Sequence, residues 1–242
     1  EPFYELRQDV FLGLEWDALA AHFDEVMAAG RSVSVFHDFG ERTREVWVKA
    51  DPGHAPPATL FGALPARIAH NPVPGGDPAN CTEQLGAPGP WSERLPHFRS
   101  GFTPSNGEEI QSEWFVAREH AVAAITALRP LAGAIRRVLQ IAELRVIAGD
   151  DLWMSPQYGR RSAGLHFTWR LDPAAVMPVC ADIERALAPF AARPHWGKLF
   201  TPGGPAWTPE RLGDFLALRA ELDPAGRFAN RWLHERVLSR AP

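Results

Sequence analysis

The stretches Leu139–Ala148 (LQIAELRVIA) and Ser162–Leu171 (SAGLHFTWRL) decide the fold of this 242-residue chain. Their lengths fit β-strands, in which successive side chains point to opposite faces of a sheet. In the first stretch this alternation places Leu139, Ile141, Glu143, Arg145 and Ile147 on one face, so that an acid and a base lie between isoleucines. From this stretch alone, a cross-strand ion pair on a solvated face is the simpler explanation of the two charges.

The second stretch changes that interpretation, because one of its faces is apolar and the other carries His166 and Thr168. If the two strands pair, their apolar faces pack on the helix that follows Pro173. Their polar faces then bring Glu143, Arg145, His166 and Thr168 together. Such a surface offers the hydrogen-bonding groups that a polyhydroxylated ligand needs. A lone histidine is more often part of a core or of a solvated surface, so this prediction depends on its neighbours.

The rest of the chain mixes helices and strands without the regular alternation that a parallel sheet requires. The spacing of apolar residues predicts helices over 15–29, 117–128, 173–190 and 209–222. In the last of these we expect the apolar side chains to be buried, namely Leu212, Phe215, Leu216 and Leu222. Strand patterns cover residues 3–12, 32–36 and 44–49, and a turn signal at 105–108 predicts a hairpin between 97–103 and 109–116. We therefore predict an α+β fold, an antiparallel sheet flanked by helices.

Residues 51–102 contain ten prolines, which deny this segment long helices or central strands. Irregular stretches of this length in a compact domain are commonly functional or packed over a site, although a linker would have a similar composition. The aromatic residues Trp91, Phe98 and Phe102 favour packing over a linker.

Composition and charge exclude several classes of function. With 25 basic and 29 acidic residues and a net charge of -4, the chain has no surplus of positive charge for binding nucleic acid or an anionic membrane. No apolar stretch is long enough to span a bilayer. Cys81 and Cys180 form no disulfide framework, and no Cys/His spacing predicts a metal site. The residues after Glu1 do not form a signal peptide, so we expect a soluble, cytoplasmic protein.

The segment Arg193–Lys198 (RPHWGK) combines a proline and a glycine, which restrict the backbone, with an aromatic and two titratable groups, His195 and Lys198. Of the 25 basic residues 23 are arginine, and the two lysines are Lys49 and Lys198. For Lys49 we infer no function, and we attribute its rarity only to the coding composition that makes the chain rich in arginine. Lysine differs from arginine in that it can lose its proton when desolvated or placed near another cation. Lys198 is therefore a candidate general base, although a solvated surface charge is the simpler alternative.

Six segments are specific in combination and follow one another along most of the chain: residues 81–84 (CTEQ), 88–98 (PGPWSERLPHF), 143–145 (ELR), 166–169 (HFTW), 193–198 (RPHWGK) and 222–228 (LDPAGRF). In these segments the chain resembles the bacterial alditol oxidases, also called xylitol oxidases, which belong to the vanillyl-alcohol-oxidase type of flavoprotein oxidases. The last segment alone is shared with other relatives, including the aldonolactone oxidases.

The resemblance implies a substrate domain built on a large antiparallel sheet, with FAD held mostly by a separate N-terminal domain. Glu143, Arg145, Thr168 and Lys198 match the positions that bind the polyol, and His195 matches a residue that contacts the flavin. The implied reaction transfers a hydride from the terminal carbinol of an alditol such as xylitol or sorbitol to FAD, and O2 is then reduced to H2O2. Lys198 and Arg145 are implied to act at the reacting hydroxyl.

The chain departs from the family in lacking a Gly-rich phosphate-binding stretch, which implies that it corresponds to the C-terminal half of such an enzyme. Residues 1–200 are then the substrate-binding domain, and residues 201–242 pack toward the N-terminal FAD-binding domain, without which we expect no activity. Two alternatives stay open: an aldonolactone or sugar oxidase of the same fold, and a cofactor-free polyol-binding domain.

Overall fold

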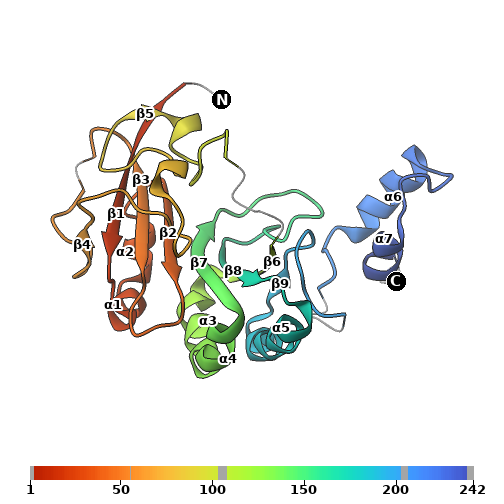
Figure 1. Cartoon of the computed structure of the whole chain (residues 1–242). Coiled ribbons are helices and arrows are strands. Elements are labelled where there is room, and N and C mark those ends of the chain that lie inside the picture. The colour runs from red at the N-terminus through yellow and green to blue at the C-terminus, as the bar shows by residue number, and fades with distance from the viewer. Residues whose placement is uncertain (1–2, 55, 103–107, 203–206, 239–242) are drawn as a thin grey trace.

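The computed structural model describes residues 3–54, 56–102, 108–202 and 207–238. Within these residues, one nine-stranded sheet has the order β4-β1-β3-β2-β7-β8-β6-β9, and β5 also pairs with β1 (Figure 1). Every pair is antiparallel, which confirms the predicted α+β class. The strands are β1 (Glu5–Leu12), β2 (Ser32–His37), β3 (Glu45–Ala50), β4 (Leu64–Pro65), β5 (Gly89–Pro90), β6 (Glu109–Ala117), β7 (Leu139–Ile147), β8 (Ser162–Arg170) and β9 (Arg193–Pro194).

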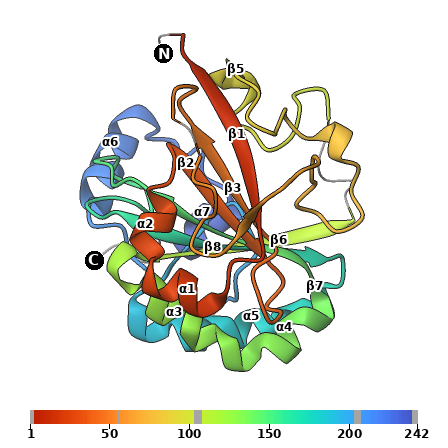
Figure 2. The same cartoon turned by 90° about the vertical axis from the view of Figure 1, so that its left-hand side faces the viewer.

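Helices cover one face of this sheet, as the turned view makes clear (Figure 2). They are α1 (Trp16–Ala21), α2 (Phe23–Met27), α3 (Ala121–Leu128), α4 (Ala132–Val138) and α5 (Pro173–Leu187). The main core lies between the helices and the sheet, where Phe167 and Trp169 of β8 join the same buried cluster as Val176 and Ile183 of α5. The apolar faces of the two central strands therefore pack on α5, as predicted.

Two predicted helices differ in the structure. The helix expected over 15–29 is divided into α1 and α2 at His22, whose φ of -125° leaves the helical region. The helix expected from Ala117 begins later. Ala117 still pairs with Ser162 as the end of β6, and a 3-10 turn at Arg118–His120 precedes α3. At this junction sheet pairing overrides helix propensity.

Strands β7 and β8 pair as the sequence predicted, with Glu143 opposite His166 and Arg145 opposite Gly164. The register shifts between Leu139 and Ile141. Because a bulge moves the following side chains to the other face, Leu139 joins the helix-side core, whereas Ile141 joins a small second cluster on the opposite face. The prediction that Leu139 shares a face with Glu143 is therefore wrong.

The Pro-rich residues 51–102 lie on the face that the helices leave free (Figure 2). Their described part contains only short elements, namely β4, β5 and two 3-10 turns, Pro78–Asn80 and Trp91–Glu93. The segment packs as expected, because Phe98 and Cys81 join a cluster with Trp47 of β3. In the described residues 97–102 no strand pairs with β6, which pairs with β8 and β9, and Phe98 instead bridges Cys81. The turn residues 105–107 of the predicted hairpin lie outside the described residues.

Helices α6 (Leu212–Leu222) and α7 (Arg231–Arg236) stand at one end of the molecule, beyond β9 (Figure 1). Among the apolar residues of α6 only Leu212 is buried, and Leu222 is largely exposed, so the predicted burial of this helix is wrong. The sequence interpretation also missed α7, whose Trp232 ring lies 5.4 Å from that of Trp196. Within the described residues, no helix has the length and apolar character needed to cross a membrane.

Candidate active site

The candidate site lies on the face opposite the helices, where β7, β8 and β6 adjoin (Figure 1). Glu143 of β7 pairs with His166 of β8, which in turn pairs with Glu113 of β6. Side chains directly opposite one another on paired strands share a face of the sheet. The three strands therefore present a row of carboxylate, imidazole and carboxylate.

Glu113 is the anionic centre of this row, with a side chain that is 1% exposed. Its Oε1 accepts hydrogen bonds from Arg145 Nη2 at 2.7 Å and Nε at 3.2 Å, and its Oε2 accepts one from Lys198 Nζ at 2.7 Å. Burial alone would raise the pKa of Glu113, but the neighbouring His166 and the charges of Arg145 and Lys198 outweigh burial and lower it. Glu113 is therefore a carboxylate that holds two cations in place.

Lys198 also determines the state of the neighbouring histidine. Its Nζ lies 2.8 Å from His166 Nδ1, and His166 Nε2 lies 3.2 Å from Thr168 Oγ1. Because an ammonium can only donate, His166 Nδ1 must accept and Nε2 carries the ring proton toward Thr168. The Thr168 hydroxyl, having accepted this bond, keeps its own hydrogen for another acceptor.

The turn after β9 places Lys198 on this row. The amide of His195 donates to the carbonyl of Glu113 at 2.9 Å, and the amide of Leu199 donates to Gln111 of β6 at 2.8 Å. Between them, Lys198 N donates to His195 O at 3.1 Å, which closes a tight turn. Backbone pairing with β6 on both sides of the turn therefore holds the lysine over Glu113.

Glu143 forms the other end of the row and contacts two basic groups. Its Oε2 lies 3.5 Å from Arg145 Nη1, and its Oε1 lies 3.5 Å from Nε2 of His97 in the Pro-rich segment. Burial acts to raise the pKa of Glu143, but the contact with His97 and the charge of Arg145 lower it overall. The structure thus brings together Glu143, Arg145, His166, Thr168 and Lys198, all five predicted from the sequence.

His195, the predicted flavin contact, lies beside this group and is half-buried. Its Nδ1 accepts a hydrogen bond from Gly197 N at 3.0 Å, so its Nε2 carries the proton of the neutral ring. Burial, the largest cause, lowers the pKa of His195. It is therefore a neutral donor at the edge of the row.

Two hollows open over the row. One of about 170 Å³ is lined by Glu143, His166 and Thr168 together with aromatic residues of β2 and the Pro-rich segment. The other, of about 480 Å³, is open and is lined by Lys198, its turn and the start of β6. Glu109 and Gln111 line both hollows, so the two are adjacent. Together they expose the polar row to a small ligand.

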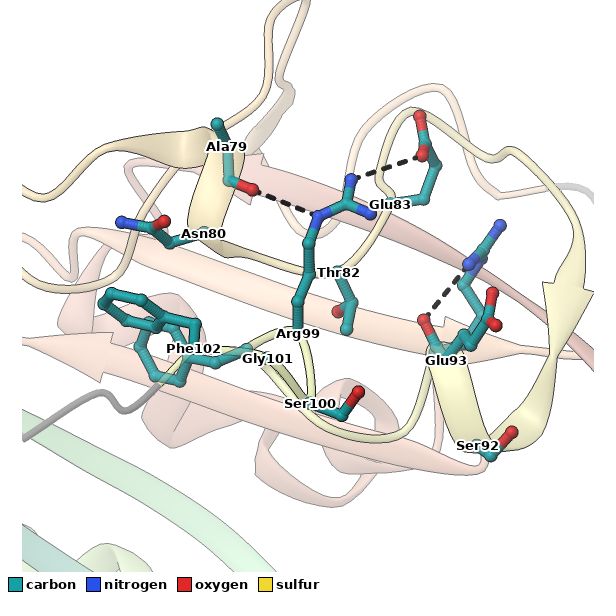
Figure 3. Close-up of a pocket in the computed structure, with 12 residues that line it drawn as sticks. Ala79, Asn80, Thr82, Glu83, Ser92, Glu93, Arg99, Ser100, Gly101 and Phe102 are labelled. Atoms are coloured by element: carbon teal, nitrogen blue, oxygen red, sulfur yellow. Dashed lines mark hydrogen bonds and ion pairs between the residues drawn. The ribbon is translucent and has the colours of Figure 1, made fainter.

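A larger hollow of about 540 Å³ lies within residues 79–102 (Figure 3). There Arg99 donates to the carbonyl of Ala79 at 3.0 Å and pairs with Glu83 at 3.6 Å. All of its lining residues belong to the Pro-rich segment. It shares Phe98 with the smaller hollow over the row, but none of the titratable side chains of the row lines it, and we do not assign it to the active site. In the described part of the chain, no group of His, Cys, Asp or Glu side chains could hold a metal ion, and both cysteines are buried and free.

Glu113, His97 and Lys49 were missed by the sequence interpretation. Glu113 alternates with the core residue Trp114 in β6, a signal that could have placed it on the polar face. Lys49, for which we inferred only coding composition, is 1% exposed and contacts His97. No local pattern indicates that contact, because the two residues are 48 positions apart.

Comparison with known proteins agrees with the motifs. The D-arabinono-1,4-lactone oxidase family matches residues 104–236. A curated alditol oxidase of Streptomyces sp. is 46% identical over 238 residues, which are 97% of this chain and 57% of that protein. The chain thus spans little more than half the length of this relative. An anthrone oxidase-like protein of known structure aligns with a TM-score of 0.27 and 11% identity over 80% of this chain and 92% of its own, which is too distant to inform on fold or site. The family match, over more than half of the sequence, shows that the chain belongs to the D-arabinono-1,4-lactone oxidase family.

Proposed function

We propose that this chain is the substrate-binding part of an FAD-dependent oxidase that oxidises the terminal hydroxyl of alditols such as xylitol and sorbitol. Family membership supports an oxidoreductase, and the Streptomyces alditol oxidase supports the substrate class. The observation that carries the proposal is the pair of cations, Arg145 and Lys198, both bound to the buried carboxylate of Glu113 beside an open hollow.

A polyol needs alternating donors and acceptors, and the row supplies both. The Arg145 side chain is 36% exposed, so its guanidinium keeps donors for ligand oxygens after it has bound Glu113. Glu143, held as a carboxylate, accepts hydrogen bonds from hydroxyls, and Thr168 can donate its own hydrogen. Groups directly opposite one another on adjacent strands are about 5 Å apart, so one polyol chain can contact groups of more than one strand.

Lys198 and Arg145 would bind the hydroxyl that reacts. As the hydroxyl loses its proton, two cations next to the oxygen stabilise the developing negative charge. Lys198 can pass a proton to His166 Nδ1, 2.8 Å away, and take the proton of the hydroxyl in its place. The proton lost by the hydroxyl is then taken up within the pair of Lys198 and His166, and no water molecule is needed to accept it.

Bound FAD would supply the hydride acceptor, and O2 would be reduced to H2O2 when the cofactor is reoxidised. The residues present fit the ring end of a flavin, because His195 offers a neutral Nε2 donor beside the open hollow. We propose that the rest of the cofactor is bound by a partner domain N-terminal to this chain, toward which residues 201–242 pack.

The test joins this chain to the remaining part of the Streptomyces alditol oxidase and measures peroxide formed from xylitol. We expect activity with the natural sequence and a loss of about 10²- to 10³-fold in kcat/KM for Lys198→Ala, because one stabilising cation and the proton relay are removed. Full activity of Lys198→Ala would contradict the role of the lysine.

The same fusion distinguishes the other candidates. Faster oxidation of an aldonolactone or a sugar than of any alditol would change the assigned substrate class. Calorimetric binding of xylitol by the isolated chain, with no flavin bound by the fusion, would instead indicate a cofactor-free polyol-binding domain.

A further inference from the structure

The second lysine of the chain is buried beneath the Pro-rich segment. Lys49 of β3 donates through Nζ to the carbonyl of Leu95, and the same atom lies 3.2 Å from His97 Nδ1. Burial, the largest cause, lowers the pKa of Lys49 to about 8, while the charge of Glu143 acts to raise it. A buried lysine with these contacts is costly to retain unless its hydrogen bonds are used.

His97 connects this lysine to the candidate site. Its Nε2 lies 3.2 Å from Ser34 Oγ and 3.5 Å from Glu143 Oε1. The edges of the rings of Phe36 and Trp47 enclose it, with centroid distances of 5.2 and 5.4 Å. These ring contacts restrain the imidazole, with Nε2 directed toward Ser34 and Glu143.

The backbone around His97 is also anchored. The amide of Thr82 donates to the carbonyl of His97 at 3.0 Å, and the Thr82 hydroxyl donates to Pro96 O at 2.7 Å. Gln8 of β1 in turn donates to the carbonyl of Thr82 at 3.2 Å. The Pro-rich segment thus carries a histidine whose position depends on three strands of the sheet, β1, β2 and β3.

The direction of the hydrogen bonds follows from the chemistry of the donors. Burial lowers the pKa of His97, so the ring is neutral and carries one proton. Since the Lys49 ammonium can only donate, it occupies Nδ1 and leaves the proton on Nε2. His97 Nε2 then donates to Ser34 Oγ at 3.2 Å and presents its N–H side to Glu143 Oε1 at 3.5 Å, while Glu143 Oε2 stays with Arg145.

We infer that Lys49 of β3 and His97 of the Pro-rich segment are positioning residues. They orient the Glu143 carboxylate so that it accepts hydrogen bonds from the hydroxyls of a polyol. The substrate in this inference rests on the proposed function, whereas the orientation of His97 by Lys49 does not. By this arrangement the segment over the sheet forms part of the ligand site.

The first test measures the tautomer of His97 in the 242-residue chain, using 15N-histidine labelling and long-range proton–nitrogen spectra, with the His97→Gln variant to assign the signal. We expect a protonated Nε2 and an unprotonated Nδ1. In Lys49→Met this preference should fall, whereas Lys198→Met should alter His166 and leave His97 unchanged. A His97 protonated on Nδ1, or a tautomer unaffected by Lys49→Met, would overturn the inference.

The second test compares two variants of His97 in the fusion that oxidises xylitol. His97→Gln keeps a donor nitrogen near the position of Nε2, and His97→Phe fills the same aromatic site without a donor. We expect His97→Phe to raise the KM for xylitol about tenfold with little change in kcat, and His97→Gln to restore most of the affinity. An equal rise in both variants, or no rise in His97→Phe, would mean that His97 only packs.

The two proposals fail separately. If the fusion with the natural sequence does not oxidise alditols, the proposed function is wrong, and the tautomer of His97 still decides whether Lys49 orients it.

Discussion

Two lysine–histidine pairs occupy the same face of the sheet, and they are used differently. Lys198 contacts Nδ1 of His166 at 2.8 Å, and Lys49 contacts Nδ1 of His97 at 3.2 Å. The Lys198 side chain is 17% exposed beside an open hollow, whereas Lys49 is 1% exposed under the Pro-rich segment. A ligand can therefore reach the pair of Lys198 and His166, whereas the pair of Lys49 and His97 is covered.

The difference lies in what balances each charge. Lys198 has a carboxylate of Glu113 at 2.7 Å, while the hydrogen-bond partners of Lys49 in the structure are a carbonyl and an imidazole, both neutral. Neutral acceptors do not offset the loss of water around an ammonium, so burial dominates at Lys49. A lysine paired with a carboxylate can remain a cation at a reaction centre, whereas an unbalanced one is suited to orienting a neighbour.

We call Lys198 and His166 the outer pair, and Lys49 and His97 the inner pair. The largest effect should come from removing the carboxylate of Glu113, which binds Lys198 of the outer pair. In Glu113→Ala, Lys198 and Arg145 lose their shared anion, and we expect the free energy of unfolding to fall by about 3 kcal/mol. This is the low end for a broken buried pair, because the Arg145 guanidinium is about one third exposed. Oxidation of xylitol by the fusion should fall with it. Urea unfolding measures the first effect.

The matched control is Glu119→Ala, which removes an exposed acid just beyond the end of β6. Its stability should stay within about 0.5 kcal/mol of the natural chain. If Glu113→Ala were no less stable than this control, Glu113 would not be holding the two cations.

A second effect belongs to the inner pair and depends on pH. The folded chain loses the Lys49 proton near pH 8, while the unfolded chain keeps it until about pH 10.5. Between these values the unfolded state binds more protons than the folded state. The contribution of Lys49 to the free energy of unfolding therefore rises with pH. Below pH 8 both states are protonated and the penalty for burying the charge is present in full.

We therefore compare the natural chain with Lys49→Met from pH 7.5 to 10.5 by urea unfolding. The natural chain should gain about 2 to 3 kcal/mol relative to the variant across this interval. The comparison is needed because Cys81, which faces Lys49, has its pKa raised to about 11 by burial and titrates in the opposite sense. Glu143 and His97 also face Lys49 but stay in one state throughout. A constant difference between the two proteins would show that Lys49 is not desolvated.

The smallest expected effect tests how closely Glu113, the carboxylate that binds Lys198, is packed. A Cβ added at Gly164 would lie 3.0 Å from Glu113 Oε1 and 3.1 Å from Ile147 Cδ1. Gly164→Ala should therefore displace the carboxylate slightly and destabilise the chain by about 1 kcal/mol. Gly133→Ala in α4 meets nothing within 4 Å and should instead stabilise by about 0.5 kcal/mol. Opposite signs in thermal unfolding are expected, and equal stabilisation of both would contradict close packing at Gly164.

Much of the site was predictable because it lies on strands with clear alternation. The faces of β7 and β8 place Glu143, Arg145, His166 and Thr168 together once the two strands pair. Lys198 was found by its rarity and its rigid turn. Glu113 could have been found by the same alternation in β6, but the pattern of that strand does not say which neighbour it pairs with.

Other features could not be predicted from local patterns. The break at His22 and the bulge before Ile141 arise because helices and strands adjust to one another when they pack. The exposure of α6 depends on what lies near it in space, since an apolar pattern states only which face could be buried. Lys49 and His97 are brought together by a segment with almost no regular structure, for which periodicity carries no information.

The sequence by itself determined the α+β class, the polar faces of β7 and β8 and the family, because alternation and short motifs are local properties of the chain. Only the tertiary structure decided that Glu113 binds both cations and that each lysine donates to a histidine. Those contacts depend on strand order and on the packing of residues 51–102 over the sheet, which bring together groups 32 to 85 positions apart.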